Sequence, residues 1–396
     1  MPRVAFRASW CVRLDARDDS FQGLAKGEPK PQRSRDAGRR PFAARRRAYY
    51  VTDRTIAYVM EQTLGSVTHY LNLRRYEGAS ERSLPRWIPI KYLEARAPWT
   101  VTGSLRARRA LGPVLDEVAG IFMHTTALAP LSLDYFVKKP TVLSCDGTPL
   151  NKRGMREMYG LKPEGPLAER VKRRIYREVF ARARGFVAWS EWAKQSFVSD
   201  YGCRELDVAV IPPGIDLDQF SAGDRDHELP RILFVGGDFV RKGGDLLLSV
   251  FRKRFRGRAE LVLATRANIP EEPGVRVFRD LKANSPALRD LYATSDLFVL
   301  PTRADCYSLV CMEALASSLP LVATRVGGIP EIVLEGETGH LIDVDDAEAL
   351  GATLERLITQ PAERQRMGAQ GRLDAMRRFD ARDNARRLFE FVDSRC

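Results

Sequence analysis

The feature that most constrains the fold of this chain is an alternation of short apolar runs with amphipathic stretches from residue 48 onward. Short apolar runs bounded by turn residues are typical of buried strands. Apolar residues at three- and four-residue spacing are typical of helices. Strand–helix–strand alternation predicts parallel sheets covered on both faces by helices, so the expected fold class is α/β.

The alternation runs in two series, separated by Pro212-Pro213-Gly214 and the polar stretch 221–229. In the first series, the predicted strands are 48–51, 87–92, 120–123, 141–144, 185–189 and 208–211, with helices at 56–73, 105–118 and 168–183. In the second series, the predicted strands are 232–235, 261–264, 275–278, 297–300, 321–323 and 340–342, with helices at 245–255, 285–292 and 307–317. The stretch 347–392 is predicted to be helical almost throughout.

We therefore expect two Rossmann-like domains, 48–212 and 231–379, joined by a linker at 213–230. Residues 380–396 are expected to form a C-terminal helix that packs back on the N-terminal domain. A chain of 396 residues is long enough for two domains. Ligands of open α/β sheets bind outside the carboxyl ends of the strands, so a cleft between the two domains is the expected site.

The positive charge is concentrated near the N-terminus. The chain has 64 Lys+Arg against 51 Asp+Glu, a net charge of +13, and residues 1–47 hold 13 basic against 5 acidic residues, which is +8. The remaining 349 residues therefore carry only +5. Composition favours a disordered basic leader over 1–47, with a tether to anionic lipid or nucleic acid as the alternative. A nucleic-acid reader would carry its basic face on the folded part, so no nucleic-acid partner is expected.

Several common motifs are missing from the sequence. No GxGxxG follows a strand, and GxxxxGK[ST], HExxH and GxSxG are absent, which argues against dehydrogenases, P-loop NTPases, zinc proteases and α/β-hydrolases. The four histidines lack ligand spacing, so no metal and no cofactor is expected. The stretch that most resembles a membrane span, 306–324, contains Glu313 and Pro320. A carboxylate and a proline in mid-span are costly in lipid, so we interpret the stretch as a buried core segment. Six cysteines without CxxC spacing are typical of a reducing compartment, and we expect a cytoplasmic protein.

The loop after the first strand of the second series has the composition of an anion site. Gly236 and Gly237 let backbone N–H groups approach a ligand, and Arg241 and Lys242 add two cations before the next helix. This pattern suits a diphosphate. A tight turn with a solvated basic pair remains the structural alternative.

A second group of candidates begins after the predicted strand 297–300. Asp305 is expected at the start of the helix near Tyr307, where ordinary capping would explain it. Glu313, eight residues later, lies among apolar residues, where a carboxylate is costly to bury without partners. Ligand hydroxyl groups would be such partners. A third motif, Gly327-Gly328 followed by Glu331, reads as a structural turn that could also line a nucleotide pocket.

The order of these motifs from 231 to about 379, with Trp189–Trp192 and Ile211–Asp216 upstream, resembles the retaining GT-B glycosyltransferases of family 4. This group is related to glycogen synthase and bacterial mannosyltransferases. The resemblance implies two Rossmann-like domains facing across a cleft. It also implies transfer of a sugar, with retention, from a nucleotide-diphosphate sugar to a glycan, lipid-linked or small-molecule acceptor. Such enzymes act in polysaccharide or glycolipid synthesis, so peripheral contact with an anionic membrane at its inner face is a further expectation.

The resemblance also implies roles for individual residues. Lys242 matches the lysine that neutralises the donor diphosphate, with Arg241 assisting and Gly236 and Gly237 in the same loop. Glu313 matches the glutamate that holds the nucleotide ribose, and Asp305 matches the carboxylate that contacts the transferred sugar. The backbone N–H groups expected to meet the β-phosphate at a helix N-terminus belong to Ser308, Leu309 and Val310.

The sequence also departs from the family pattern. The first acidic residue of the E-x7-E motif is Asp305, one methylene shorter, and Gly237 stands where an arginine is usual. Asp146, after the strand 141–144, takes the place of the family's histidine near the sugar. These changes leave a catalytically degenerate sugar-nucleotide-binding protein as the alternative function.

In the first half of the chain, one histidine and one basic helical segment each have two interpretations. His124 follows the strand 120–123 at the expected carboxyl edge, so it is a candidate substrate-binding residue, with a buried structural histidine as the alternative. The basic helical segment Leu105–Arg109 could meet an anionic lipid surface or be solvated.

Overall fold

The computed structural model describes residues 55–396, apart from 63–68, 70–71, 77–81, 92–98 and 161–163. The described residues belong to one compact unit that begins at Tyr49. The expected leader 1–47 and the predicted strand 48–51 lie outside the described residues.

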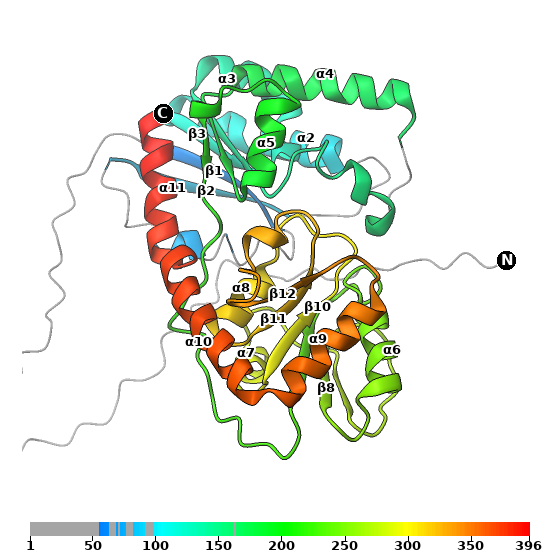
Figure 1. Cartoon of the computed structure of the whole chain (residues 1–396). Helices are drawn as coiled ribbons and strands as arrows, with labels where there is room; N and C mark the ends of the chain where they lie inside the picture. The colour runs from blue at the N-terminus through cyan, green and yellow to red at the C-terminus, as the bar shows by residue number, and fades with distance from the viewer. Residues whose placement is uncertain (1–54, 63–68, 70–71, 77–81, 92–98, 161–163) are drawn as a thin grey trace, which may run out of the picture. The chain divides into compact units, whose positions relative to one another are not determined.

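Six parallel strands form the N-terminal sheet, in the order β2-β1-β3-β4-β5-β6 (Figure 1). The strands are β1 (Thr55–Gln62), β2 (Leu84–Lys91), β3 (Gly120–His124), β4 (Thr141–Cys145), β5 (Gly185–Ala188) and β6 (Val208–Val210). Helices of this half include α2 (Trp99–Leu111), α3 (Leu133–Lys138), α4 (Pro166–Arg182) and α5 (Glu191–Ser199), and the described residues 69 and 72–75 are also helical.

Six further parallel strands form the C-terminal sheet, in the order β12-β11-β10-β7-β8-β9. The strands are β7 (Arg231–Val235), β8 (Glu260–Ala264), β9 (Val275–Phe278), β10 (Leu297–Leu300), β11 (Leu321–Thr324) and β12 (Gly339–Ile342). The helices are α6 (Gly244–Arg254), α7 (Pro286–Ala293), α8 (Leu309–Ala316), α9 (Ala347–Thr359), α10 (Pro361–Arg378) and α11 (Ala381–Arg395). The expected α/β class with two parallel sheets is confirmed. None of the described helices is long and apolar enough to cross a membrane.

The prediction of a helix over 56–73 is wrong in its first part, because this stretch begins as the interior strand β1, whereas residues 69 and 72–75 are helical. β1 pairs in parallel with β2 on one side and β3 on the other. Its residues alternate between two cores: Ala57 and Val59 pack on one face of the sheet, and Ile56, Tyr58 and Met60 on the other. A strand that is apolar on both faces loses the period-two signal, so periodicity alone cannot distinguish it from a buried helix.

The helix predicted at 105–118 is also shifted in the structure. α2 begins at Trp99 and ends at Leu111, and the chain continues as a 3-10 helix over Gly112–Glu117. Pro113 explains this end, because a proline disfavours α-helical geometry in the residue before it. The other predicted strands are present to within a few residues, and 221–229 contains no helix or strand.

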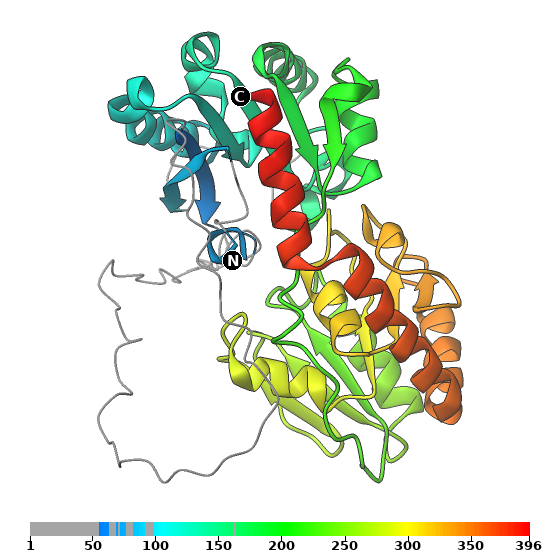
Figure 2. The same ribbon diagram turned by 90° about the vertical axis from the view of Figure 1, so that its left-hand side faces the viewer.

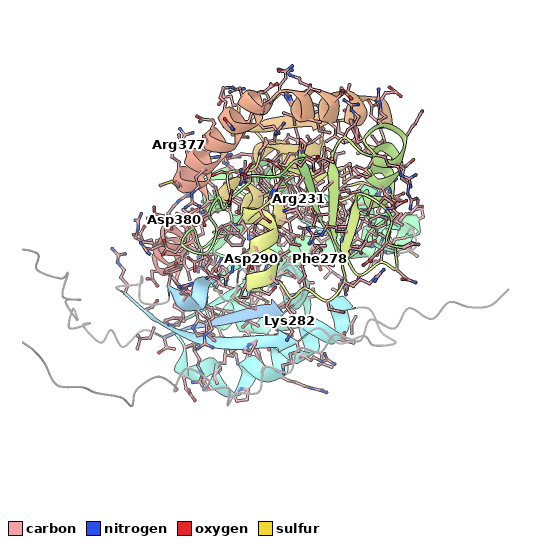
Figure 3. The ribbon with its side chains drawn as sticks, turned by 90° about the horizontal axis from the view of Figure 1, so that it is seen from below. Arg231, Phe278, Lys282, Asp290, Arg377 and Asp380 are labelled. Carbon is pink, nitrogen blue, oxygen red and sulfur yellow. The ribbon has the colours of Figure 1, made fainter. Side chains whose placement is uncertain are left out.

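Helix α11 covers the face of the N-terminal sheet that carries Tyr58. Phe389 and Leu388 of α11 are buried against Ile56, Tyr58 and Phe122. Figure 2 shows the helix in red beside this sheet. Asp380 caps its first turn by accepting hydrogen bonds from the N–H groups of residues 382 and 383, and Figure 3 labels Asp380 and Arg377 beside the α10–α11 junction. The C-terminal end of the chain therefore completes the N-terminal core.

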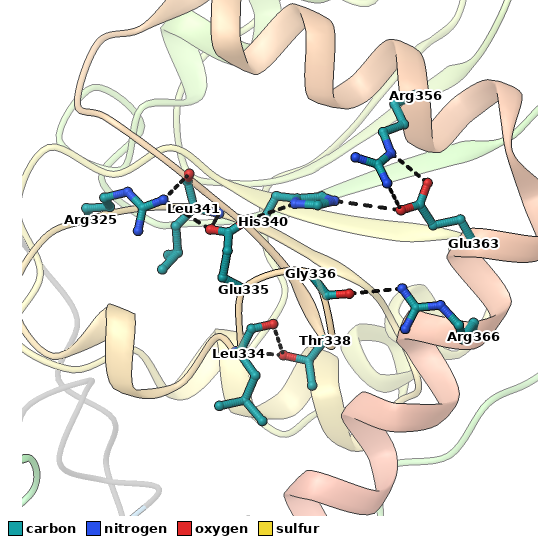
Figure 4. A network of polar contacts seen from close by, with 10 residues as sticks. All are labelled: Arg325, Leu334, Glu335, Gly336, Thr338, His340, Leu341, Arg356, Glu363 and Arg366. Atoms are coloured by element: carbon teal, nitrogen blue, oxygen red, sulfur yellow. Dashed lines mark hydrogen bonds and ion pairs between the residues drawn. The ribbon is translucent and has the colours of Figure 1, made fainter.

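A polar network fixes the turn between β11 and β12 (Figure 4). The Glu335 carboxylate accepts hydrogen bonds from the Leu341 N–H at 2.9 Å and interacts with His340 Nδ1 at 2.8 Å. Arg366 of α10 donates to the Gly336 carbonyl at 2.9 Å. His340 thus serves in a structural network at the sheet edge.

We predict that Phe389→Ala lowers the free energy of unfolding by about 3–5 kcal/mol, because it opens a cavity between α11 and the sheet. Phe389 is fully buried, with its ring centroid 5.4 Å from that of Tyr58. Chemical denaturation measures the change. Leu373→Ala, at a position on α10 that is 55% exposed, is the control and should change stability by less than about 0.5 kcal/mol. Equal destabilisation by the two variants would contradict the packing.

Candidate functional site

The glycine loop between β7 and α6 is fixed by a close backbone approach. Gly243, the residue before α6, has φ of 76°, and a Cβ there would collide with the Pro301 carbonyl after β10. Only glycine meets both demands. The Gly236 N–H donates to the Ala264 carbonyl at 2.9 Å, and Gly237 lies against Arg266. The loop is therefore held beside the end of β10.

This loop brings Lys242 to the Asp305 carboxylate, with which it forms an ion pair. The side chains are 15% and 11% exposed, so the pair is screened little by solvent. Arg241 lies next to it, because its Nη1 donates to the Ala304 carbonyl at 2.7 Å and its Nε to Asp238 at 3.1 Å. Two cations and one carboxylate predicted for the site thus meet at the carboxyl ends of β7 and β10.

Helix α8 begins at the same place. Ser308 is its N-cap residue, and its side chain makes no capping hydrogen bond. The N–H groups of the first helical turn, including those of Leu309 and Val310, have no acceptor within the helix. The positive end of the helix dipole therefore begins at Ser308, three residues beyond Asp305, on the chain segment that Lys242 contacts.

Glu313 lies further along α8 in a different environment. It is 5% exposed, and the Tyr292 hydroxyl of α7 donates to its Oε2 at 2.8 Å. Burial raises the pKa of this carboxyl to about 7, while the hydrogen bond from Tyr292 acts in the opposite direction. Tyr292 is a partner that the sequence pattern missed, because it comes from another helix 21 residues upstream.

Asp146 follows β4 and forms an ion pair with Lys152 at 2.8 Å. The segment after it contacts the second half of the chain: Met155 packs with Ala304 and Cys306, and Tyr159 lies under the Arg241 guanidinium, 4.6 Å from the ring centroid. Lys152 and Tyr159 were also missed by the sequence analysis. Their segment has no periodicity, and nothing in the sequence shows what it touches.

His124 is the last residue of β3, and its ring is buried. It is 1% exposed and stacks on Trp189, with 5.0 Å between centroids and 11° between the planes. Its Nδ1 lies 3.2 Å from the Ser144 hydroxyl. Burial, with a smaller contribution from Lys152, lowers the pKa of His124 to about 3, so the ring is neutral at physiological pH.

The Gly327-Gly328 turn packs against the loop that contains Asp305, and the residues after the turn contact the start of helix α5. Gly327 has φ of 57° and packs on the Asp305 carbonyl, and the Gly328 N–H donates to the Cys306 carbonyl at 2.8 Å. Glu331 then accepts hydrogen bonds from the N–H groups of Glu191 and Trp192 at 2.7 and 2.8 Å. Glu331 thus caps a helix of the N-terminal half.

Among the described residues, no group of three or more His, Cys, Asp or Glu side chains could hold a metal ion. The polar groups described above are a pair of cations, an ion-paired carboxylate, a helix N-terminus and a buried carboxyl of raised pKa. Such an arrangement can stabilise negative charge at one point and accept hydrogen bonds from hydroxyl groups nearby.

Comparison with known proteins identifies the family. Residues 68–219 match the family described as Glycosyltransferase Family 4, and residues 229–360 match the family described as Glycosyl transferases group 1. The chain belongs to the group 1 glycosyltransferases of the family 4 type and has the GT-B fold.

Two curated relatives show the extent of the similarity. A D-inositol 3-phosphate glycosyltransferase from Thermobifida fusca is 30% identical over 203 residues, which cover 44% of this chain and 47% of that protein. A GDP-mannose-dependent alpha-(1-6)-phosphatidylinositol monomannoside mannosyltransferase from Mycolicibacterium smegmatis is 28% identical over 238 residues, covering 52% and 61%. The chain spans about half the length of the curated relatives it matches.

Solved structures share the fold at low sequence identity. Sucrose-phosphate synthase from Thermosynechococcus elongatus superposes with a TM-score of 0.69 and 16% identity, covering 86% of this chain and 98% of that one. Anabaena HepE in complex with UDP superposes with a TM-score of 0.67 and 14% identity, covering 86% and 100%. At this identity the likeness establishes the architecture alone.

We predict that Glu313 makes the free energy of unfolding depend on pH in one direction. Its pKa is about 7 in the folded chain against 4.5 for an ordinary glutamate, so its favourable contribution is complete below pH 4.5 and is lost as the pH rises through 7. Relative to Glu313→Gln, the wild type should lose roughly 2–3 kcal/mol between about pH 5 and pH 8. Denaturant unfolding of both proteins measures this difference. The exposed Glu337→Gln should follow the wild type, and parallel pH curves for wild type and Glu313→Gln would contradict the assignment.

Proposed function

We propose that this protein transfers a hexose from a nucleotide-diphosphate sugar to a carbohydrate or lipid-linked acceptor with retention of configuration. The observation that carries the proposal is the convergence of Lys242, Arg241 and the α8 N-terminus beside Asp305. Family membership supplies the reaction class. The relative that uses GDP-mannose and the neighbour that binds UDP support a nucleotide donor of this kind.

In this proposal the donor binds residues 231–379 and the acceptor binds residues 48–212, with 213–230 as the linker and 380–396 as the returning helix. The nucleoside diphosphate is the leaving group, and its phosphates carry the negative charge that must be stabilised. Lys242 would exchange Asp305 for a phosphate oxygen, and Arg241, held by Ala304 and Asp238, would add a second cation. Backbone N–H groups of Ser308, Leu309 and Val310 would donate to the β-phosphate. Because these positive groups are already in position before the reaction, they stabilise the leaving group without reorganisation of the protein.

The exchange also gives Asp305 its role. Once Lys242 turns to the phosphate, the Asp305 carboxylate is free to accept hydrogen bonds from hydroxyl groups of the sugar. Glu313 would accept hydrogen bonds from the ribose while Tyr292 holds its Oε2. On the acceptor side, Asp146 is oriented by Lys152. His124, neutral and buried, would line the sugar pocket by shape rather than charge.

The reaction itself needs no protein nucleophile in this proposal. The bond between the sugar C1 and the diphosphate oxygen breaks, and the acceptor oxygen forms a new bond to C1 on the same face. The acceptor proton passes to an oxygen of the departing diphosphate. The protein's contribution is therefore electrostatic and orientational.

We predict that Lys242→Ala lowers kcat/KM by at least about 100-fold, because the leaving group loses its main counter-charge. The measurement is sugar transfer or donor hydrolysis across UDP-, GDP- and ADP-sugars, after a thermal-shift screen with UDP, GDP and ADP selects the base. Lys253→Ala, on the exposed face of α6, is the matched control and should keep full activity. Thermal unfolding confirms that both variants are folded. Turnover of Lys242→Ala within about twofold of the wild type would remove the assignment.

We also predict that a chelator leaves the transfer rate unchanged to within about twofold, because Lys242, Arg241 and the helix N-terminus supply the positive charge. Initial rates in EDTA and in MgCl2, with the same donor and acceptor, test this directly. A rate that collapses in EDTA and returns with added magnesium would show that the diphosphate charge is balanced by a cation from solution.

A further inference from the structure

Arg266 is an exposed cation at the carboxyl edge of the C-terminal sheet, next to the glycine loop of the candidate site. Strands β7 and β8 pair in parallel, and their last residues, Val235 and Ala264, are partners in the register. The segments that follow them therefore leave the same edge of the sheet side by side. Buried Thr265 holds the second segment, because its N–H donates to the Phe278 carbonyl at 3.0 Å. The Arg266 side chain thus begins at a fixed point beside the glycine loop.

The guanidinium of Arg266 occupies the space in which a side chain at position 237 would begin. A Cβ at Gly237 would lie 2.6 Å from Arg266 Nη2, 3.0 Å from Nε and 3.2 Å from Cζ. Gly237 does not have a positive φ, so its backbone conformation does not require glycine. The missing side chain instead makes room for the guanidinium to lie against the loop.

The other two cations of the site are already engaged within the chain. Lys242 is paired with Asp305, and its stem packs on Gly236, where a Cβ would lie 3.0 Å from Lys242 Cβ. Arg241 donates to a carboxylate and to a backbone carbonyl. In the described part of the chain, Arg266 has neither a hydrogen bond nor an ion pair. Its guanidinium can therefore offer its N–H donors to a ligand.

The strand order of the sheet separates Arg266 from the start of helix α8. Strand β7 lies between β10 and β8. Asp305 and the α8 N-terminus follow β10, whereas Arg266 follows β8. In the proposed reaction the α8 N-terminus binds the β-phosphate, which carries the sugar. A diphosphate that lies across the β7 loop therefore presents its other phosphate, the one that carries the nucleoside, on the β8 side.

We propose that Arg266 binds the α-phosphate of the nucleotide-diphosphate donor, the phosphate to which the nucleoside is attached. A guanidinium suits this ligand because its planar fork donates parallel hydrogen bonds to phosphate oxygens. The inference rests on the proposed function, because the ligand is the donor of that reaction. It assigns a donor-binding residue outside both the lysine loop and helix α8.

Isothermal titration calorimetry on the full chain tests the proposal with UDP, GDP and ADP and with the corresponding monophosphates and nucleosides, weak ligands being measured by displacement. Arg266→Gln should weaken binding of the preferred diphosphate by at least about tenfold. The monophosphate of the same base should lose a similar factor, because it also contains the α-phosphate, and the nucleoside should change by less than about twofold. Lys242→Ala should instead weaken the diphosphate more than the monophosphate.

A charge-matched control and a double-mutant cycle complete the test. Arg170→Gln removes an exposed arginine of α4 and should leave all affinities unchanged. Gly237→Ala places a methyl group where the guanidinium lies, so it should weaken the diphosphate by at least about threefold in the wild type. In the Arg266→Gln background the same change should cost less than about 1.5-fold. Equal losses in the two backgrounds would overturn the proposed contact.

The outcomes separate this inference from the proposed function. Thermal unfolding confirms that each variant is folded. A wild type that binds none of these nucleotides would overturn the proposed function and the inference together. If the wild type binds a diphosphate and Arg266→Gln binds it within about twofold, the inference alone is wrong. A loss with the diphosphate that is absent with the monophosphate would likewise overturn the assignment to the α-phosphate.

Discussion

The site depends on the topological switch point of the C-terminal sheet, between β7 and β10. β7 and β10 are neighbours in the sheet, although β8 and β9 lie between them in the sequence. From β7 the chain continues to β8 on one side of this pair, and from β10 it continues to β11 on the other side. This divergence leaves room at the carboxyl edge of the sheet, which is where ligands of such sheets bind. Gly243 brings the β7 loop against the end of β10, and that approach carries Lys242 to Asp305. A side chain at 243 would separate the two loops.

Two carboxyl groups eight residues apart acquire opposite character from their surroundings. Asp305, at the loop, has a cation as its partner, so its charge is compensated. Glu313, about one turn into α8, accepts a hydrogen bond from the Tyr292 hydroxyl, and burial favours its neutral form. The same short segment therefore presents an ion-paired carboxylate just before the helix and a carboxyl that titrates near neutrality within the core.

The sequence predicted much of this structure because its signals are local. Strand–helix alternation identified both sheets, and the glycine loop with Asp305 and Glu313 identified the residues that the C-terminal sheet gathers. Strand β1 was missed because burial on both faces removes the alternation that marks a strand. Lys152, Tyr159 and Tyr292 were missed for another reason. Each matters through a contact with a segment distant in the chain, and no local pattern encodes such a contact.

Glu331 illustrates how the two halves share a structural element. Helix α5 belongs to the N-terminal half, and Ser190 supplies its own cap by accepting a hydrogen bond from the Ala193 N–H. The first two N–H groups of the helix instead rely on a carboxylate from the C-terminal half. If the halves separated, these two N–H groups would be exposed to water, and the loss of the cap would destabilise helix α5 by about 0.5–2 kcal/mol. Helix α5 therefore has all of its capping partners only when the two halves meet.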